Sequence, residues 1–310
     1  MALAFALAAA LQAHAANLVV GDQSYSARTV MEAAGVLKDL PYTLQWKQFT
    51  AGSPVAEALN SGSLDVGLLG DAPALFLGAL GAPIKVIGVS RQNLAGVAII
   101  VPKGSSIQTV ADLKGKRVAI WKGAWSQQLM LSALDKAGVP RDQVEYRYLS
   151  ALDAAHALDG GSVDATATWD PYVTQQERQG GRIIATAQGL IPAQSFVVAN
   201  DTSIKNKRTQ IADFLHRLQV ARTWATDSPA HAEAYAIAWS TITKADADVA
   251  RAWFGRAQIS VGPVTPQAIE GAQRTIDFFN AQGLTKTYPA AQVFDNSFSG
   301  AFAQPAQASR

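Results

Sequence analysis

The sequence has no cysteine among its 310 residues. Without cysteine the chain has no disulfide, no thiolate metal ligand, no cysteine nucleophile and no N-terminal cysteine to carry a lipid. If the chain is exported, we therefore expect it to be free in its compartment.

Clusters of one charge sign are also missing. The 26 Lys and Arg residues nearly balance the 24 Asp and Glu residues, and the net charge is +2. No run of Lys or Arg indicates a nucleic-acid surface or a polybasic membrane patch. A hydrophobic content of 49% is ordinary for a folded domain. The composition predicts a folded protein with a small-molecule ligand and no nucleic-acid partner.

Long apolar runs are confined to the first fifteen residues, "MALAFALAAALQAHA". This segment is too short to cross a bilayer and ends in an A-x-A cleavage pattern, which predicts a signal peptide over residues 1–15. No Lys or Arg precedes it, and an ordinary N-terminal helix is the alternative. An exported binder without an anchor would diffuse away from a cell lacking an outer membrane, so the expected location is a Gram-negative periplasm.

Motifs for common catalytic chemistry are absent as well. The chain has no GxSxG, no Walker loop and no GxGxxG after a strand, and its histidines lack metal-ligand spacing. A carboxylate pair for acid–base work stays open, but nothing requires one. No cofactor or metal is predicted.

An internal repeat appears when the chain is shifted by 99 residues. "FTAGSPVAEALNSGSLDVGLLGDAP" (49–73) then lies over "YLSALDAAHALDGGSVDATATWDPY" (148–172) without a gap. Asp65 meets Asp164 and Asp71 meets Asp170, and caps, turns and apolar runs coincide in order. Each copy is predicted to be β-α-β-α-β-α-β-β, which is typical of an open, largely parallel sheet covered by helices.

Two lobes follow from this duplication. We expect the chain to cross between them near residues 101–103 and 199–201. After residue 203 the apolar spacing is helical, and this segment forms a third domain or folds back on the first lobe.

The loops that follow the strands are the expected ligand site. In open α/β sheets ligands bind beyond the carboxyl ends of the strands, where helices begin. Six helix starts could face one cleft, and their unpaired N–H groups attract anions without needing Lys or Arg.

Four side chains at these junctions have two interpretations each. Asp71 and Asp170 either cap the helices that follow or accept hydrogen bonds from a ligand. Trp125 and Trp169 either pack as half-buried rings or line an apolar slot. The tryptophans at 224, 239 and 253 lie on helical apolar faces and are interpreted as structural.

Three segments carry a family resemblance: "GSLDVGLLGDAPALFLGALGAPIKVIG", "VADLKGKRVAIWKGAWSQQLMLSALDKAG" and "GSVDATATWDPYV". Over residues 17–285 the chain resembles the periplasmic aliphatic sulfonate-binding proteins of ABC importers, within the sulfonate/nitrate/taurine-binding group. The resemblance implies a type II periplasmic binding protein fold, an α/β fold of two similar lobes joined by two crossover segments, with the C-terminal helices on the first lobe. The implied domains are a first lobe of residues 16–101 with 202–310 and a second lobe of residues 102–201.

The resemblance also implies a ligand site, a role and partners. The chain would be a monomer that captures alkanesulfonates between its lobes and delivers them to a membrane permease with a cytoplasmic ATPase. Taurine, nitrate, an aromatic sulfonate or a sulfate ester are alternative ligands, and an enzyme on the same fold is the alternative of another class. The implied ligand-binding residues are Gln23, Ser24, Tyr25, Gly52, Ser53, Gly70, Asp71, Ala72, Gly123, Ala124, Trp125, Ser126, Trp169, Asp170, Ser195 and Phe196.

Overall fold

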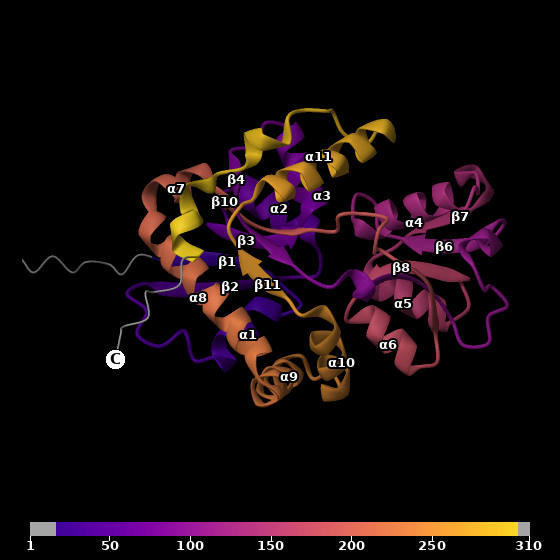
Figure 1. Cartoon of the computed structure of the whole chain (residues 1–310), viewed down its shortest axis with the longest axis horizontal. Helices are drawn as coiled ribbons and strands as arrows, with labels where there is room; N and C mark the ends of the chain where they lie inside the picture. Colours follow the sequence, from indigo (N-terminus) through magenta and orange to yellow (C-terminus); the bar gives the residue numbers. More distant parts are fainter. Residues whose placement is uncertain (1–16, 303–310) are drawn as a thin grey trace, which may run out of the picture.

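Two β-sheets organise the chain, and each is the centre of one α/β lobe (Figure 1). The computed structural model describes residues 17–302. The first sheet has the strand order β11 (Ser260–Gly262), β4 (Ile84–Arg91), β10 (Ser195–Asn200), β3 (Val66–Gly70), β1 (Asn17–Gln23), β2 (Thr43–Phe49). The second has the order β7 (Glu145–Tyr148), β6 (Arg117–Ile120), β8 (Ala165–Trp169), β5 (Val97–Val101), β9 (Arg182–Thr186).

The predicted element order is confirmed in both repeats. The first copy runs from β1 to β5 through three α-helices, and the second from β6 to β10 through three more. These helices are α1 (Ser26–Ala33), α2 (Gly52–Asn60), α3 (Asp71–Ala79), α4 (Trp125–Lys136), α5 (Ala151–Asp159) and α6 (Tyr172–Arg178).

Turn residues of the repeat have matching backbone roles. Gly62 and Gly161, both at the end of a helix, have φ of 73° and 69°, a left-handed conformation that glycine adopts without steric cost. Asp65 accepts a hydrogen bond from the Val19 N–H over 2.7 Å, and Asp164 accepts one from the Arg117 N–H over 2.8 Å. The turn residues that defined the repeat in the sequence therefore have the same backbone conformation and hydrogen bonds in both copies.

The last strand of each copy is exchanged between the lobes. β5 pairs antiparallel with β8 and β9 in the second sheet, whereas β10 pairs antiparallel with β3 and β4 in the first. Both strands are buried in the lobe they join: Ile99 belongs to the core of the second lobe and Phe196 to a core of the first.

This exchange corrects the predicted crossings. The chain passes between the sheets in residues 92–96 and 187–194, one strand earlier than the expected positions near 101–103 and 199–201. The expected boundaries after residues 101 and 201 assign β5 and β10 to the wrong lobes. The backbone hydrogen bonds of an exchanged strand go to the partner sheet, and its apolar sequence carries no sign of which sheet that is.

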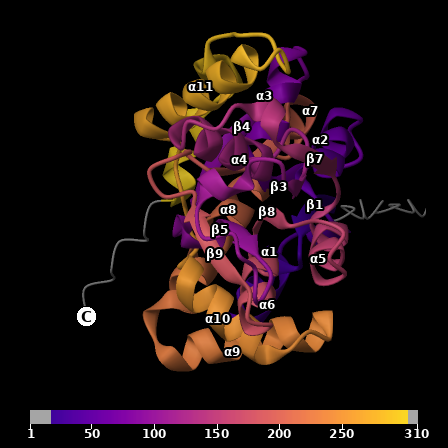
Figure 2. The same cartoon turned by 90° about the vertical axis from the view of Figure 1, so that its right-hand side faces the viewer.

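The C-terminal helices pack mainly on the first lobe, as expected (Figure 1). They are α7 (Asp201–Asn206), α8 (Arg208–Asp227), α9 (Pro229–Thr243), α10 (Ala247–Ala257) and α11 (Pro266–Ala281). Ser228 and Thr265 cap α9 and α11, each with proline as the first helical residue, where the missing N–H does no harm. In Figure 2, α9 and α10 lie at one end of the molecule and α11 at the other. α10 also contacts α6 of the second lobe.

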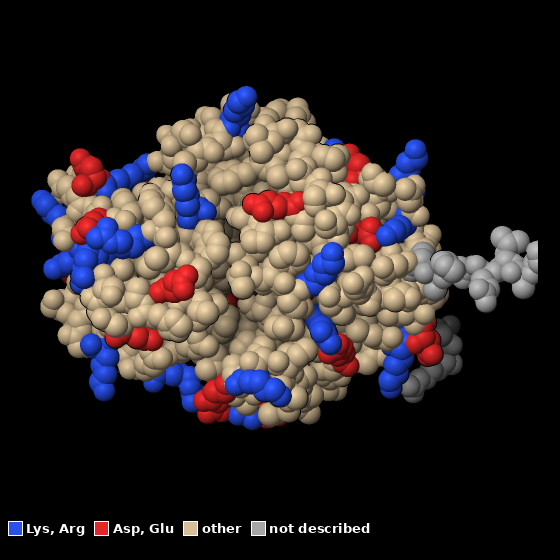
Figure 3. Space-filling model, turned by 180° about the vertical axis from the view of Figure 1, so that it is seen from behind, with Lys and Arg blue, Asp and Glu red and all other residues tan. Residues whose placement is uncertain are grey.

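The surface agrees with the composition. On the face shown in Figure 3, Lys and Arg are intermingled with Asp and Glu, without a region of one sign. In the described part of the chain, no helix combines the length and apolar character needed to cross a membrane. The predicted signal peptide lies outside the described residues.

Candidate functional site

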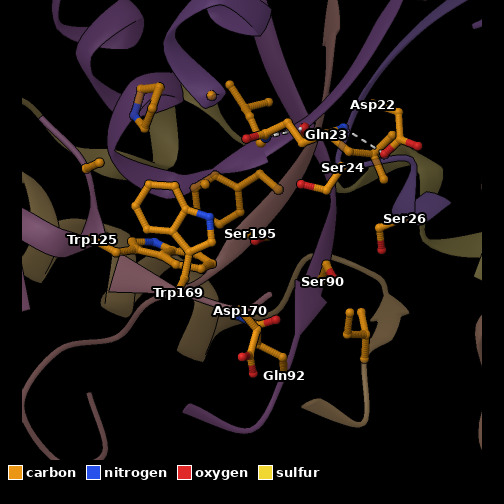
Figure 4. Close-up of a pocket in the computed structure, with 18 of the residues that line it drawn as sticks. Asp22, Gln23, Ser24, Ser26, Ser90, Gln92, Trp125, Trp169, Asp170 and Ser195 are labelled. Atoms are coloured by element: carbon orange, nitrogen blue, oxygen red, sulfur yellow. Dashed lines mark hydrogen bonds between the residues drawn. The ribbon is translucent and has the colours of Figure 1, made fainter. Parts of the chain in front are cut away.

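A cavity of about 150 Å³ lies between the two lobes, at the carboxyl ends of the central parallel strands. Figure 4 shows Ser24, Ser26 and Asp22 on one side of it and Trp125 and Trp169 on the other. Its lining residues are Asp22, Gln23, Ser24, Ser26, Thr50, Gly52, Leu68, Leu69, Gly70, Pro73, Ser90, Gln92, Ala124, Trp125, Trp169, Asp170, Ser195, Phe196, Arg222, Trp253 and Ile259.

Five of the six predicted helix starts reach this cavity. Residues at the beginnings of α1, α2, α3, α4 and α6 line it, whereas the start of α5 at Ser150 does not. The Ser150 side chain instead caps its own helix by accepting from the Asp153 N–H.

The amides at these helix starts are not equally available. Asp22 accepts hydrogen bonds from the Ala27 and Arg28 N–H groups at the start of α1. At the start of α3, the Asp71 N–H donates to the Gln194 carbonyl and the Ala72 N–H donates to the Asp71 carboxylate. α2 and α4 have no side-chain cap. Helix amides that a ligand could use are therefore found at α2 and α4 rather than at every junction.

The side chain of Asp71 neither caps the start of α3 nor faces the cavity, the two roles predicted for it. It is the first residue of α3, is fully buried, and does not line the cavity. Its carboxylate accepts from Trp125 Nε1 over 2.8 Å and from Thr275 Oγ1 over 3.1 Å. Burial raises the pKa of Asp71 to about 6, although these donors oppose the shift. The carboxylate links the lobes and is not open to a ligand.

Asp170 has the predicted capping role together with an ion pair. Its carboxylate accepts from the Thr174 N–H over 2.9 Å, within α6. Arg256 of α10 donates to both carboxylate oxygens, over 2.9 and 3.0 Å. Asp170 lines the cavity, but its acceptor sites are already occupied by protein donors.

The loop of residues 122–126, KGAWS, differs most from the expectation that its glycine and serine bind ligand. The Ser126 hydroxyl is buried and bonded to the backbone of Trp121, accepting from its N–H and donating to its carbonyl, so it does not line the cavity. Gly123 has φ of 69°, and a Cβ there would lie 2.7 Å from Phe76 of the first lobe. Glycine at 123 therefore allows the two lobes to approach closely.

Aromatic rings form the apolar wall. Trp125 and Trp169 meet edge to face, with ring centroids 6.4 Å apart and planes at 81°. Trp125 also lies against the Gly70 backbone across the cleft. Trp253, interpreted from the sequence as structural, packs in the first-lobe core and also lines the cavity. Its helical apolar spacing gave no sign of this second role.

The cavity brings together ten of the sixteen sequence-predicted residues. The ten are Gln23, Ser24, Gly52, Gly70, Ala124, Trp125, Trp169, Asp170, Ser195 and Phe196. The six that do not line it are Tyr25, Ser53, Asp71, Ala72, Gly123 and Ser126. Several of these six hold the lobes or the helix starts in place.

Polar lining residues that the sequence reasoning missed are more informative. Thr50, Ser90 and Gln92 stand just after or at the ends of strands β2 and β4, which a search of every strand end could have found. Arg222 comes from α8, far along the chain, where it occupies a buried position between Leu218 and Ala225. A charged residue at an apolar helical position is the signal that could have singled it out.

The site is rich in donors that suit an anion. Four hydroxyl side chains line the cavity: Ser24, Thr50, Ser90 and Ser195. None of these hydroxyls forms a hydrogen bond with another group among residues 17–302. Hydroxyls and the α2 and α4 amides can donate to an oxyanion, while the tryptophans can contact an apolar group. No cluster of three His, Asp or Glu side chains suited to a metal occurs in the described residues.

A ligand-sized cavity between two α/β lobes defines a two-lobed binding protein, and comparison with solved structures supports this class. The alkanesulfonate-binding protein SsuA from Xanthomonas axonopodis pv. citri, bound to MOPS, superposes with a TM-score of 0.83 at 29% identity, covering 91% of this chain and 99% of that one. The desulfurization enzyme DSZB has a TM-score of 0.68 at 15% identity over 92% of this chain and 98% of its own, a likeness of fold alone. The predicted type II periplasmic binding protein fold is confirmed.

Sequence comparison gives the family. The NMT1/THI5-like family model matches residues 44–232, more than half of the sequence, and the chain belongs to this family. A protein of Escherichia coli K12, named for binding aliphatic sulfonates, is 39% identical over 186 residues. That match covers 59% of this chain and 58% of the relative's length. A second E. coli K12 relative, 30% identical over 173 residues, is likewise named as a binding protein, for taurine.

Proposed function

We propose that this chain is the solute-binding protein of an ABC importer, and that it binds sulfonates in the cavity between its lobes. The observation that carries the proposal is the composition of that cavity, in which hydroxyls and helix-start amides face an aromatic wall. The relatives named for sulfonate binding support the same assignment.

The chemistry of a sulfonate suits these donors. The group is ionised at any biological pH and offers three acceptor oxygens and no donor, so it requires a site made of donors. Each hydrogen bond to a charged group contributes about 1.5–3 kcal/mol, so three or four can hold a small ligand despite desolvation. The carbon chain of the ligand would contact Trp125, Trp169 and Phe196.

The remaining parts of the proposal concern location and partners. The protein acts in the periplasm and delivers its ligand to a membrane permease driven by a cytoplasmic ATPase. It binds without turnover, in keeping with the names of its relatives. Closure of the lobes over the ligand involves residues 92–96 and 187–194, where the chain crosses between the sheets.

A thermal-shift panel tests the ligand class. Alkanesulfonates, taurine, nitrate and sulfate are compared, with 1-propanol as a control that shares the carbon chain and lacks the anion. A ligand at 100 times its Kd stabilises the native state by about 2.7 kcal/mol, so sulfonates should raise the melting temperature clearly. A shift with nitrate and none with any sulfonate would contradict the proposal, and conversion of any ligand would favour an enzyme.

A further inference from the structure

Arg222 is a buried cation at the wall of the cavity. Its exposed fraction is 6%, and it comes from the C-terminal half of α8. The guanidinium donates to the Ser26 hydroxyl over 2.9 Å and to the Tyr235 hydroxyl over 3.0 Å. Both partners are neutral. Burial of a charge is costly unless an opposite charge or several hydrogen bonds offset it.

No acidic side chain forms an ion pair with Arg222 among residues 17–302. The Arg222 charge acts on the buried Asp22 carboxylate, whose pKa it lowers against the effect of burial, but no hydrogen bond or ion pair joins the two groups, which both line the cavity. The Asp22 carboxylate is already the acceptor for the N–H groups of Gln23, Ala27 and Arg28. Arg256, the other arginine near the cavity, is paired with Asp170 and Glu177. Arg222 is thus the cavity's arginine that has no carboxylate in contact.

The neighbours of Arg222 orient further donors. The Tyr235 hydroxyl donates to the Ser26 carbonyl over 2.9 Å while it accepts from Arg222. The Ser26 hydroxyl accepts from Arg222 and keeps its own proton for Tyr235 or for an anion in the cavity. Ser26 lines the cavity beside Ser24. This end of the space therefore has a positive charge, two hydroxyls and the Asp22 carboxylate, which backbone N–H groups already occupy.

The opposite end is apolar and has no carboxylate available to a ligand. Trp125 and Trp169 lie across the cavity from Ser24 and Ser26 (Figure 4). The two aspartates at that end, Asp71 and Asp170, are occupied by Trp125, Thr275 and Arg256. The cavity thus has one end suited to an anion and one suited to hydrocarbon.

We propose that Arg222 is the specificity-determining residue of the cavity: it supplies the counter-charge for the sulfonate head, which lies beside Ser26, while the ligand's tail points to Trp125 and Trp169. This inference rests on the proposed function and adds the orientation of the ligand and the residue that selects for its charge. Ligand binding completes an ion pair that the protein alone leaves unmade.

The test varies the charge of the ligand and of the protein together. 1-Propanesulfonate is compared with 1-propanesulfonamide, which has nearly the same shape without the charge, by isothermal titration calorimetry. The variant is Arg222→Gln. The matched control is Arg217→Gln, which removes an arginine of the same helix that binds Asp213 and the Val36 carbonyl, away from the cavity.

The expected result is a loss of charge selectivity in one variant only. The wild-type protein should prefer the sulfonate over the sulfonamide by about 100-fold, and Arg222→Gln should reduce this preference by about tenfold or more, since hydrogen bonds to charged groups are the strong ones. Arg217→Gln should keep the wild-type preference within about threefold. An unchanged preference in Arg222→Gln would overturn the inference while sulfonate binding itself stood. Absence of sulfonate binding in the wild-type protein would instead refute the proposed function.

A second pair of variants covers the case in which Arg222→Gln does not fold, which circular dichroism would show. Arg222→Lys keeps the charge but loses the planar fork, so the preference for the sulfonate should persist while both affinities fall. Ser26→Ala should weaken the sulfonate more than the sulfonamide. A Ser26→Ala variant that weakens both ligands equally, together with a lysine variant that binds both as wild type does, would place the head group elsewhere.

Discussion

The junction aspartates of the two repeats, Asp71 and Asp170, occupy equivalent positions 99 residues apart but have different partners. Asp71 is bonded to Trp125 and Thr275, neither of which is charged. Asp170 is bonded to the guanidinium of Arg256. Both bonds nevertheless run from one lobe to the other, Asp71 to α4 and Asp170 to α10. The repeat thus places a carboxylate at each side of the cleft. One accepts a hydrogen bond from the other lobe and the other forms an ion pair with it.

A second pair of equivalent residues shows the opposite outcome. Asp65 and Asp164 both accept from the backbone N–H of the neighbouring parallel strand and both bind a basic side chain, Lys207 and Arg117. A role inside one sheet was retained in both copies, because each sheet needs it. A role at the interface between lobes diverged, because the two partners across the cleft are different segments.

The largest effect on stability is expected at Asp170, where the contact between the lobes is a buried ion pair with Arg256. Arg256→Ala leaves the Asp170 carboxylate buried without its cation, and removing one partner of a buried pair costs about 3–5 kcal/mol. Urea denaturation measures this loss in the free energy of unfolding. The matched control is Arg178→Ala, which breaks exposed pairs with Asp246 and Asp248 in the same region and should have a much smaller effect. Equal losses of unfolding free energy in the two variants would show that the ion pair between Arg256 and Asp170 stabilises the protein no more than an exposed pair does.

A smaller effect, with a characteristic pH dependence, is expected at Asp71. Its pKa of about 6 lies above the ordinary value of 3.8, so protonation of Asp71 stabilises the fold below pH 4 and this stabilisation is lost as the pH rises through 6. Asp71→Asn removes the charge and keeps one acceptor oxygen for Trp125, while its amide nitrogen can donate to the Thr275 hydroxyl. Relative to wild type, the free energy of unfolding of the variant should increase by about 2–3 kcal/mol between pH 4 and pH 7.

Urea denaturation of both proteins at pH 4, 5, 6 and 7 measures this difference. Asp170→Asn is the comparison within the repeat. It removes the buried carboxylate that pairs with Arg256 and leaves only the more exposed Glu177 as its partner, so it should destabilise at neutral pH. A difference between Asp71→Asn and wild type that stays constant with pH would contradict the raised pKa.

The smallest effects are expected for the retained pair. Asp65→Ala leaves the Val19 N–H and the buried Ser203 hydroxyl without their acceptor, which should cost about 1–3 kcal/mol. It also removes the ion-pair partner of Lys207, which still donates to the Asn17 carbonyl. Asp164→Ala should cost less, because the Asp164 side chain is 30% exposed and water can replace it. Thermal unfolding of both variants measures the two losses of stability. A larger loss for Asp164→Ala would contradict the expectation that the more exposed aspartate contributes less.

Local chemistry and periodicity predicted much of the architecture from the sequence. Gly62 and Gly161, Asp65 and Asp164, and the helix starts after each strand follow from short-range rules of turns and caps, so the order of residues is enough to predict them. The gathering of strand ends such as Gly70, Ala124 and Ser195 around one cavity follows from the topology of an open sheet.

Other features depend on partners distant in sequence. The fully buried strands β5 and β10 look alike in the sequence, and only the pairing of the whole sheets assigns each to the opposite lobe. Arg222 reaches the cavity because α8 packs beneath α1, nearly 200 residues earlier in the chain. Ser126, expected to face a ligand, instead satisfies the backbone of its own loop at Trp121.

The sequence by itself determined the two α/β units, their turns and the helix starts at the strand ends, since these depend on hydrogen bonds and apolar spacing within a few residues. Only the tertiary structure decided which lobe each last strand joins, which carboxylates are already occupied, and where the buried cation lies. These features are set by contacts between segments about 55 to 200 residues apart, for which the linear order of side chains carries no local signal.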